Sequence, residues 1–164
     1  MDHLSLLAQR AAERLISCGE TIAVAESSAG GLISAALLAV PGASAYFLGG
    51  AIVYTGTARA ALLGIIAADM QGLRPASEPY ALMLARRVRE THGAVWGLAE
   101  TGATGPAGNR YGDPAGHACI ALAGPAEHVV TARTGNNDRA ANMRAFAARA
   151  LEVLAETLAK PESA

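Results

Sequence analysis

Apolar positions recur along this chain at two spacings, and the two spacings alternate. A spacing of three to four residues predicts helices over residues 3–17, 32–40, 57–64, 78–91 and 136–159. Short apolar runs predict strands over residues 21–25, 51–55, 94–99, 117–123 and 128–133. Strands that alternate with helices predict an α/β domain, and its sheet is expected to be mixed because a turn at Gly124-Pro125 makes the last two strands a hairpin.

Composition and charge narrow the class of protein. The 164 residues are 52% hydrophobic, so residues 1–160 are expected to form one domain, with a disordered tail over residues 161–164. A formal net charge of -1 and the absence of a basic run argue against nucleic acid as a partner. No apolar run is long enough to span a membrane. Cys18 and Cys119 lie far apart without metal-ligand spacing, which predicts no metal site, no disulfide and a reducing cytoplasm.

The stretch TIAVAESSAGG, residues 21–31, passes from an apolar strand to an acid, two hydroxyls and a glycine pair before the next predicted helix. A strand that stops at Glu26 and turns into a helix leaves N–H groups unpaired, and these favour an anionic group together with the helix dipole. Ser27 and Ser28 therefore stand where a nucleophile or a phosphate would lie. The alternative is that one serine only caps the helix.

A second polar stretch, ETGATGPAGNRYGDPAG, follows the predicted strand at 94–99 and is expected to be a long shaped loop over residues 100–116. If the strands before the two stretches are parallel, both loops face one crevice at the carboxyl edge of the sheet. The residues expected there are Ser27, Ser28, Gly30, Gly31, Tyr54, Thr55, Arg59, Thr101, Gly102, Thr104 and Gly105. Their hydroxyls, N–H groups and arginine suit a phosphate. The alternative is that the glycines only permit tight turns.

These residues resemble a known family. AESSAGG and the following PGASAYFLGGAIVYTGTARAALLGI are similar to the AESCTGG...PGSS...F.GG...YSN..K..LLGV pattern of the competence/damage-inducible CinA C-terminal domain, the nicotinamide mononucleotide deamidase family. TGATGP resembles that family's SGIAGP loop, and the resemblance covers most of the chain. It implies a three-layer α/β sandwich with a mixed, mostly parallel sheet of about five strands flanked by helices, and a homo-oligomer, usually a homodimer.

The resemblance also implies an activity. The family hydrolyses the carboxamide of nicotinamide mononucleotide to nicotinic acid mononucleotide and ammonia, so the expected partner is a small-molecule nucleotide and no metal or cofactor is needed. Ser27 falls at the proposed nucleophile, and Tyr54 and Arg59 fall at the family's tyrosine and lysine. Backbone N–H groups near Ser28 to Gly30 are expected to form the oxyanion hole.

Two departures from the family pattern keep the function open. Arg59 cannot act as a base because guanidinium stays protonated, so Ser27 needs another activator. The candidates are Tyr54, Glu26 and His117, and the last two are also expected to face the substrate.

The second departure is at TGNND, where the family shows SGDR. Asn137 replaces an expected arginine, for which Arg139 or Arg144 would have to compensate. Two readings follow: an amidase with Ser27 as nucleophile, favoured by the intact serine and tyrosine, or a divergent member that binds a nucleotide or protein partner without hydrolysis, favoured by the arginine at position 59. The polar residues 109–113, which the family pattern lacks, leave the substrate undecided.

Overall fold

The predicted alternation of strands and helices is present in a computed structural model, which describes residues 1–160; the tail predicted at 161–164 lies outside the described residues. The helices are α1 (His3–Cys18), α2 (Leu32–Leu38), α3 (Gly56–Leu63), α4 (Glu78–His92) and α5 (Arg139–Ala159). The strands are β1 (Ile22–Glu26), β2 (Phe47–Ile52), β3 (Trp96–Ala103), β4 (His117–Ala123) and β5 (His128–Arg133). Two 3-10 turns, η1 (Ala43–Ala45) and η2 (Ala67–Met70), lie in the connections.

The strands form one sheet in the order β2-β1-β3-β4-β5. β1 pairs in parallel with β2 on one side and with β3 on the other, whereas β4 is antiparallel to both β3 and β5. Only β4 therefore runs against the other strands of the described chain, and the predicted mixed, mostly parallel sheet is confirmed. The hairpin strands β4 and β5 have the predicted bounds.

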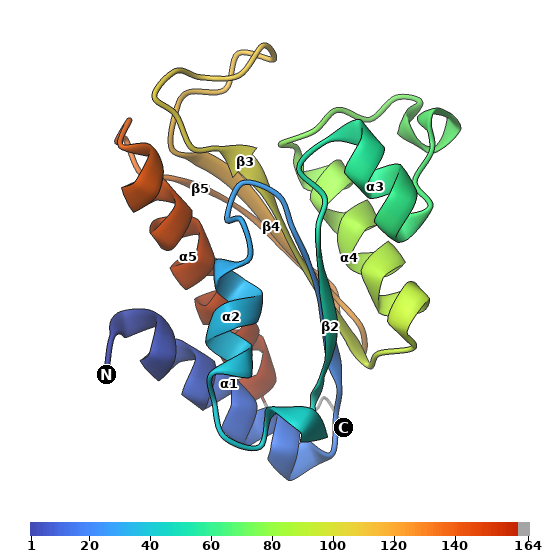
Figure 1. Cartoon of the computed structure of the whole chain (residues 1–164), viewed down its shortest axis with the longest axis vertical. Coiled ribbons are helices and arrows are strands. Elements are labelled where there is room, and N and C mark those ends of the chain that lie inside the picture. Colours follow the sequence, from blue (N-terminus) through green and yellow to red (C-terminus); the bar gives the residue numbers. More distant parts are fainter. Residues whose placement is uncertain (161–164) are drawn as a thin grey trace.

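Helices cover both faces of the sheet (Figure 1). Because side chains alternate along a strand, Ile22 and Val24 of β1 pack into one core with α1, α2 and α5, while Ala23 and Ala25 pack into a second core with α4. These two cores and the sheet between them make the predicted three-layer sandwich. Within the described residues no helix is both long and apolar enough to cross a bilayer.

The bounds of two predicted strands are wrong because of tertiary pairing, and the predicted start of α3 is wrong because of a local cap. β2 lies at 47–52 and not at 51–55, since its register with β1 begins at Phe47 opposite Ile22. β3 continues to Ala103, opposite His117 of β4, so residues 100–103 are strand and the loop covers only residues 104–116. The start of α3 is capped by Thr55, which accepts from the N–H of Ala58 at 3.1 Å.

Candidate functional site

The two polar stretches meet at one edge of the sheet. β1 lies between β2 and β3, and the three strands are parallel, so their carboxyl ends lie together. The serine turn (residues 27–31) follows β1, Tyr54 follows β2, and the loop over residues 104–116 follows β3. The predicted common edge is therefore present, and it is the end of the sheet where ligands bind in α/β folds.

Glu26 holds the end of the serine turn by capping the N-terminus of α2. Its side chain is 1% exposed. One carboxylate oxygen accepts the N–H groups of Gly31 at 3.2 Å and Ile33 at 2.8 Å, and the other accepts the N–H of Ser34 at 2.9 Å and its hydroxyl at 2.7 Å. Gly30 and Gly31 have φ values of 68° and 101°, a left-handed conformation that favours glycine. Glu26 therefore serves the helix terminus, which corrects the expectation that it faces the substrate or activates Ser27.

A second buried carboxylate, Glu100 on β3, holds the first half of the turn. Glu100 is fully buried. Its Oε2 accepts the N–H groups of Ser27 at 3.1 Å and Ala29 at 2.8 Å, and its Oε1 accepts the hydroxyl of Ser28. Desolvation raises the pKa of Glu100 from 4.5 to about 7, outweighing these three donors. Glu100 is absent from the predicted site, although an acid inside the apolar run AVWGLAE was a signal for it.

The two carboxylates use up most of the turn's N–H groups. Those of Ser27 and Ala29 bind Glu100, that of Gly30 bonds to the carbonyl of Ser27 at 3.2 Å, and that of Gly31 binds Glu26. The Ser28 N–H is the one in residues 27–31 without an acceptor in residues 1–160. The oxyanion hole expected from several N–H groups is thus reduced to this one.

The two serines of the turn differ in access. Ser28 is 5% exposed and its hydroxyl is donated to Glu100. Ser27 is partly exposed, and its hydroxyl makes no hydrogen bond within the part of the chain that the structure describes. While Ser28 donates to Glu100, only the Ser27 hydroxyl of the two is free to meet a substrate.

An arginine bridges the segments that follow β2 and β3. Arg139, the first residue of α5, donates from Nη2 to the hydroxyl of Tyr54 at 3.2 Å and from Nη1 to the carbonyl of Gly105 at 2.7 Å. Tyr54 follows β2 and Gly105 follows β3, so the bridge crosses the end of β1, which lies between them. Arg139, one of the two arginines proposed to compensate for Asn137, is therefore at the site.

Arg59 and Thr55 are directed elsewhere. Arg59 donates to the hydroxyl of Tyr80 at 3.4 Å, and its guanidinium carbon lies 5.7 Å from the centre of that ring. The Thr55 hydroxyl caps α3. The predicted grouping of Ser27, Tyr54 and Arg59 is thus assembled only in part, because the arginine packs against α4.

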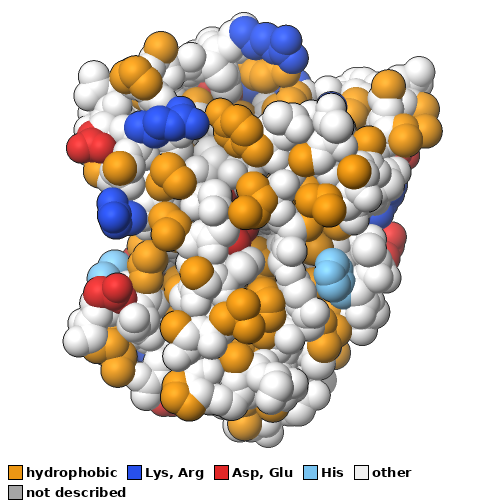
Figure 2. All heavy atoms as spheres, in the orientation of Figure 1, with side chains coloured by type: hydrophobic (Ala, Val, Ile, Leu, Met, Phe, Trp, Pro, Cys, Tyr) orange, Lys and Arg blue, Asp and Glu red, His pale blue; other side chains and the backbone are white. Residues whose placement is uncertain are grey.

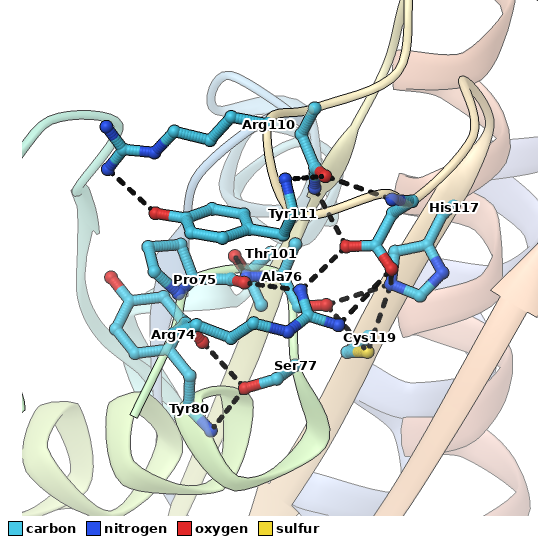
Figure 3. Close-up of polar contacts among 12 residues, drawn as sticks. Arg74, Pro75, Ala76, Ser77, Tyr80, Thr101, Arg110, Tyr111, His117 and Cys119 are labelled. Carbon is cyan, nitrogen blue, oxygen red and sulfur yellow. Dashed lines mark hydrogen bonds and ion pairs between the residues drawn. The ribbon is translucent and has the colours of Figure 1, made fainter. Parts of the chain in front are cut away.

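His117 and Thr101 lie on the opposite face of the sheet. His117 is 4% exposed, its Nδ1 accepts from Arg133 Nε at 3.3 Å, and its Nε2 therefore donates to the carbonyl of Ala76 at 2.8 Å. Thr101 accepts from the N–H of Ala76 at 3.1 Å (Figure 3). Both face α4, whereas Glu100 next to Thr101 faces the other side. His117 is therefore not an activator of Ser27, and Thr101 anchors the chain before α4 instead of facing a ligand.

The polar residues 109–113 mainly hold their own loop. Asp113 accepts from Arg74 at 2.7 and 3.3 Å and from Asn109 at 2.8 Å. Burial works to raise the pKa of Asp113, but these donors bring it below its usual value. The Tyr111 ring lies between the guanidinium groups of Arg74 and Arg110, at 5.4 and 5.0 Å (Figure 3). Residues 109–113, which the family pattern lacks, thus hold the loop against the segment before α4.

Asn142 on α5 ties together the two loops that end at the site. It is fully buried, donates to the carbonyls of Thr104 and Asn136 at 2.8 Å each, and accepts from the Thr134 hydroxyl at 2.6 Å. Thr104 itself is 2% exposed and does not face solvent, whereas Gly102, next to the end of β3, is partly exposed. Gly105 lies at the carboxyl edge of the sheet, the rim of the site, where its carbonyl accepts a hydrogen bond from Arg139.

Replacing Asn142 with alanine is expected to destabilise the fold by about 2–4 kcal/mol, because two buried carbonyls and a hydroxyl lose their partner. Urea unfolding measures the loss. Asn136→Ala is the matched control: the carbonyl that Asn142 binds is kept, so a smaller loss is expected. Equal losses in the two variants would contradict the role given to Asn142.

Two hollows are present on the described surface. One, of about 510 Å³, is lined by Pro114, Ala115, Gly135, Asn136 and Asn137. It adjoins the rim, since a Cβ on Gly105 would approach the Asn137 carbonyl to 2.8 Å and the Ala115 Cβ to 3.2 Å. The other, of about 460 Å³, lies on the outer face of α4 between Leu73 and Glu90.

Figure 2 shows basic side chains toward the upper end of the molecule, where the parallel strands β1, β2 and β3 have their carboxyl ends in Figure 1. No cluster of three metal-ligating side chains occurs among residues 1–160.

A three-layer α/β sandwich with a serine turn braced by buried carboxylates defines an α/β domain with a candidate site at the carboxyl edge of its sheet. The model of the CinA C-terminal domain matches residues 4–158, and the chain belongs to that family.

Relatives and solved structures agree with this. A CinA-like protein of Gloeobacter violaceus is 43% identical over 121 residues, covering 74% of this chain and 28% of the relative. One of Anaeromyxobacter sp. strain K is 39% identical over 137 residues, covering 82% and 34%. The chain thus spans about a third of the length of these curated relatives. The crystal structure of competence/damage inducible protein CihA from Agrobacterium tumefaciens has a TM-score of 0.88 at 28% identity, covering 98% of both chains.

Proposed function

We propose that this domain is an amidase that hydrolyses the carboxamide of nicotinamide mononucleotide, or of a closely related nucleotide, with Ser27 as nucleophile. The observation that carries the proposal is the difference between the two serines: Ser28 is tied to a buried carboxylate, whereas the Ser27 hydroxyl is unpaired within the described chain and partly exposed. An arginine bridge suited to an anionic substrate lies at the same edge of the sheet. Membership of the CinA C-terminal family supports the same activity.

The chemistry uses four groups at this edge. The Ser27 oxygen attacks the amide carbon, and the Ser28 N–H donates to the oxygen that becomes negative. Tyr54 is the remaining candidate for the proton of Ser27, because Glu26 caps α2 and His117 faces α4. Arg139 donates to the Tyr54 oxygen and fixes its position at this edge. The proton passes to the leaving nitrogen, the C–N bond breaks to release ammonia, and water then hydrolyses the acyl-Ser27 ester to the carboxylate.

The test is ammonia release by the purified protein given nicotinamide mononucleotide. Turnover that rises with enzyme concentration supports the amidase. Thermal stabilisation by the nucleotide without ammonia release would favour the second candidate, a domain that binds a nucleotide without hydrolysing it. One observation favours that candidate: Arg59, at the family's lysine position, is turned onto Tyr80.

Arg139→Gln is expected to raise KM for nicotinamide mononucleotide by about tenfold or more, because the exposed guanidinium beside the 136–137 hollow is the group placed to bind the phosphate. Nicotinamide riboside, which lacks the phosphate, serves as the control substrate, and its KM should change much less. Equal increases for the two substrates would show that Arg139 acts through Tyr54 and not on the phosphate.

The cytoplasmic location stays a prediction from the cysteine usage, and the homo-oligomer stays a prediction of the family resemblance. Both belong to this proposal and not to the described structure.

A further inference from the structure

Glu100 is a buried carboxylate for which the proposed chemistry has no use. It forms no ion pair within the described residues, and its partners are the N–H groups of Ser27 and Ala29 and the hydroxyl of Ser28. The two N–H groups share Oε2, whereas the hydroxyl has Oε1 to itself. The two oxygens thus have different kinds of partner.

This asymmetry has a consequence for protonation. An ionised carboxylate only accepts hydrogen bonds, so it can hold all three donors. A proton on Oε2 would displace two N–H groups, so the proton goes to Oε1. Oε1 must then donate, and its partner is the Ser28 oxygen. The Ser28 hydroxyl becomes an acceptor from Glu100, and its own hydrogen is released to donate elsewhere.

We propose that the protonation state of Glu100 sets the direction in which the Ser28 hydroxyl donates, and that the protonated form completes the oxyanion hole. This inference rests on the proposed amidase function. When Glu100 is neutral, the Ser28 hydroxyl joins the otherwise unpaired Ser28 N–H as a second donor to the oxyanion. When Glu100 is ionised, the hydroxyl points inward and one donor is lost. Glu100 is a positioning residue, and Ser28 is the residue that touches the reacting oxygen.

The surroundings of Glu100 favour a proton at neutral pH. Burial raises its pKa to about 7, and the charge of Glu26 on β1 acts in the same direction. α2 carries no ionisable side chain. α5 presents Arg139 at the rim, where it is bound to Tyr54 and Gly105, and His117 on β4 faces the opposite side of the sheet. Activity is therefore expected to fall as the pH rises above about 7.

Glu100→Gln tests the switch because glutamine imitates the neutral acid. Its amide oxygen can accept the N–H groups of Ser27 and Ala29, and its NH2 can donate to the Ser28 oxygen. The ratio of kcat/KM values, variant over wild type, should rise about tenfold for each pH unit above 7. A variant that follows the wild-type pH profile would overturn the switch.

Ser28→Ala is the matched variant, since it removes the hydroxyl and keeps the carboxylate. It should lower kcat by about 100-fold below pH 7, as expected for one oxyanion donor. In the Ser28→Ala background, replacing Glu100 with glutamine should change the activity by a factor that does not depend on pH. A ratio that still rises with pH would mean that Glu100 acts through a group other than Ser28, contrary to the proposal.

A stability measurement separates the switch from the amidase. Because the pKa of Glu100 rises from 4.5 to about 7 on folding, the folded state binds more protons than the unfolded chain in this interval, and stability falls as the pH increases. The urea midpoint of wild type should show this fall relative to Glu100→Gln. If the urea midpoint falls with pH but neither wild type nor any variant releases ammonia, the amidase proposal is wrong and the titration of Glu100 still stands. If the urea midpoints of wild type and Glu100→Gln change with pH in the same way, the switch is wrong, even if the protein turns over substrate.

Discussion

Ser27→Ala is expected to reduce ammonia release from nicotinamide mononucleotide by about 1,000-fold or more, because alanine cannot attack the amide carbon. The fold should be unaffected. The Ser27 hydroxyl has no partner within residues 1–160, and the backbone N–H that binds Glu100 at 3.1 Å is kept. Stability should stay within about 0.5 kcal/mol of wild type in urea unfolding.

The control for this result is the neighbouring serine. Ser28→Ala should keep measurable turnover, because it loses an oxyanion donor and not the nucleophile. The opposite pattern, with Ser28→Ala inactive and Ser27→Ala active, would make Ser28 the nucleophile and Glu100 its base, since the two already share a hydrogen bond. The pair of variants therefore decides between the two serines.

Glu26→Ala is expected to destabilise the domain by about 3–5 kcal/mol. The carboxylate is 1% exposed, and its removal leaves the N–H groups of Gly31, Ile33 and Ser34 without an acceptor at the start of α2. Urea unfolding measures the effect. Glu26→Gln keeps one acceptor oxygen and should cost less than the alanine variant. An alanine variant that unfolds like wild type but has lost activity would place Glu26 in the chemistry.

The two buried carboxylates explain where an anionic substrate is expected to bind. A helix N-terminus after a strand normally offers its N–H groups to a phosphate. In this domain Glu26 and Glu100 accept those N–H groups, so few of them are left to bind a phosphate. The phosphate is better placed at the rim, beside the exposed guanidinium of Arg139.

Local patterns predicted those parts of the fold that local chemistry decides. The hairpin strands β4 and β5 follow from short apolar runs on either side of Gly124-Pro125, and their bounds were correct to the residue. Asp138 begins α5 by accepting from the N–H of Ala141 at 3.0 Å. The serine turn and the family were also evident from the sequence, because short motifs carry them.

The extent of β2 and β3 depended on their partners. Pairing with β1 starts β2 at Phe47, and pairing with β4 extends β3 to Ala103. Neither extension is marked by a change in the residues themselves. The loop boundary at Glu100 was wrong for this reason, and the acid that braces the serine turn was taken for a loop residue.

By itself, the sequence determined the elements, the hairpin and the serine turn, since each depends on residues within a few positions of one another. Only the tertiary structure decided which groups meet at the site. Glu100 reaches Ser27 across 73 positions and Arg139 reaches Tyr54 across 85, contacts that periodicity cannot show. Strand alternation in the folded sheet likewise put His117 on the face of α4 and Glu100 under the serines. The physical reason is that a side chain's partners depend on which strands pair and in which register, and distant parts of the chain settle both.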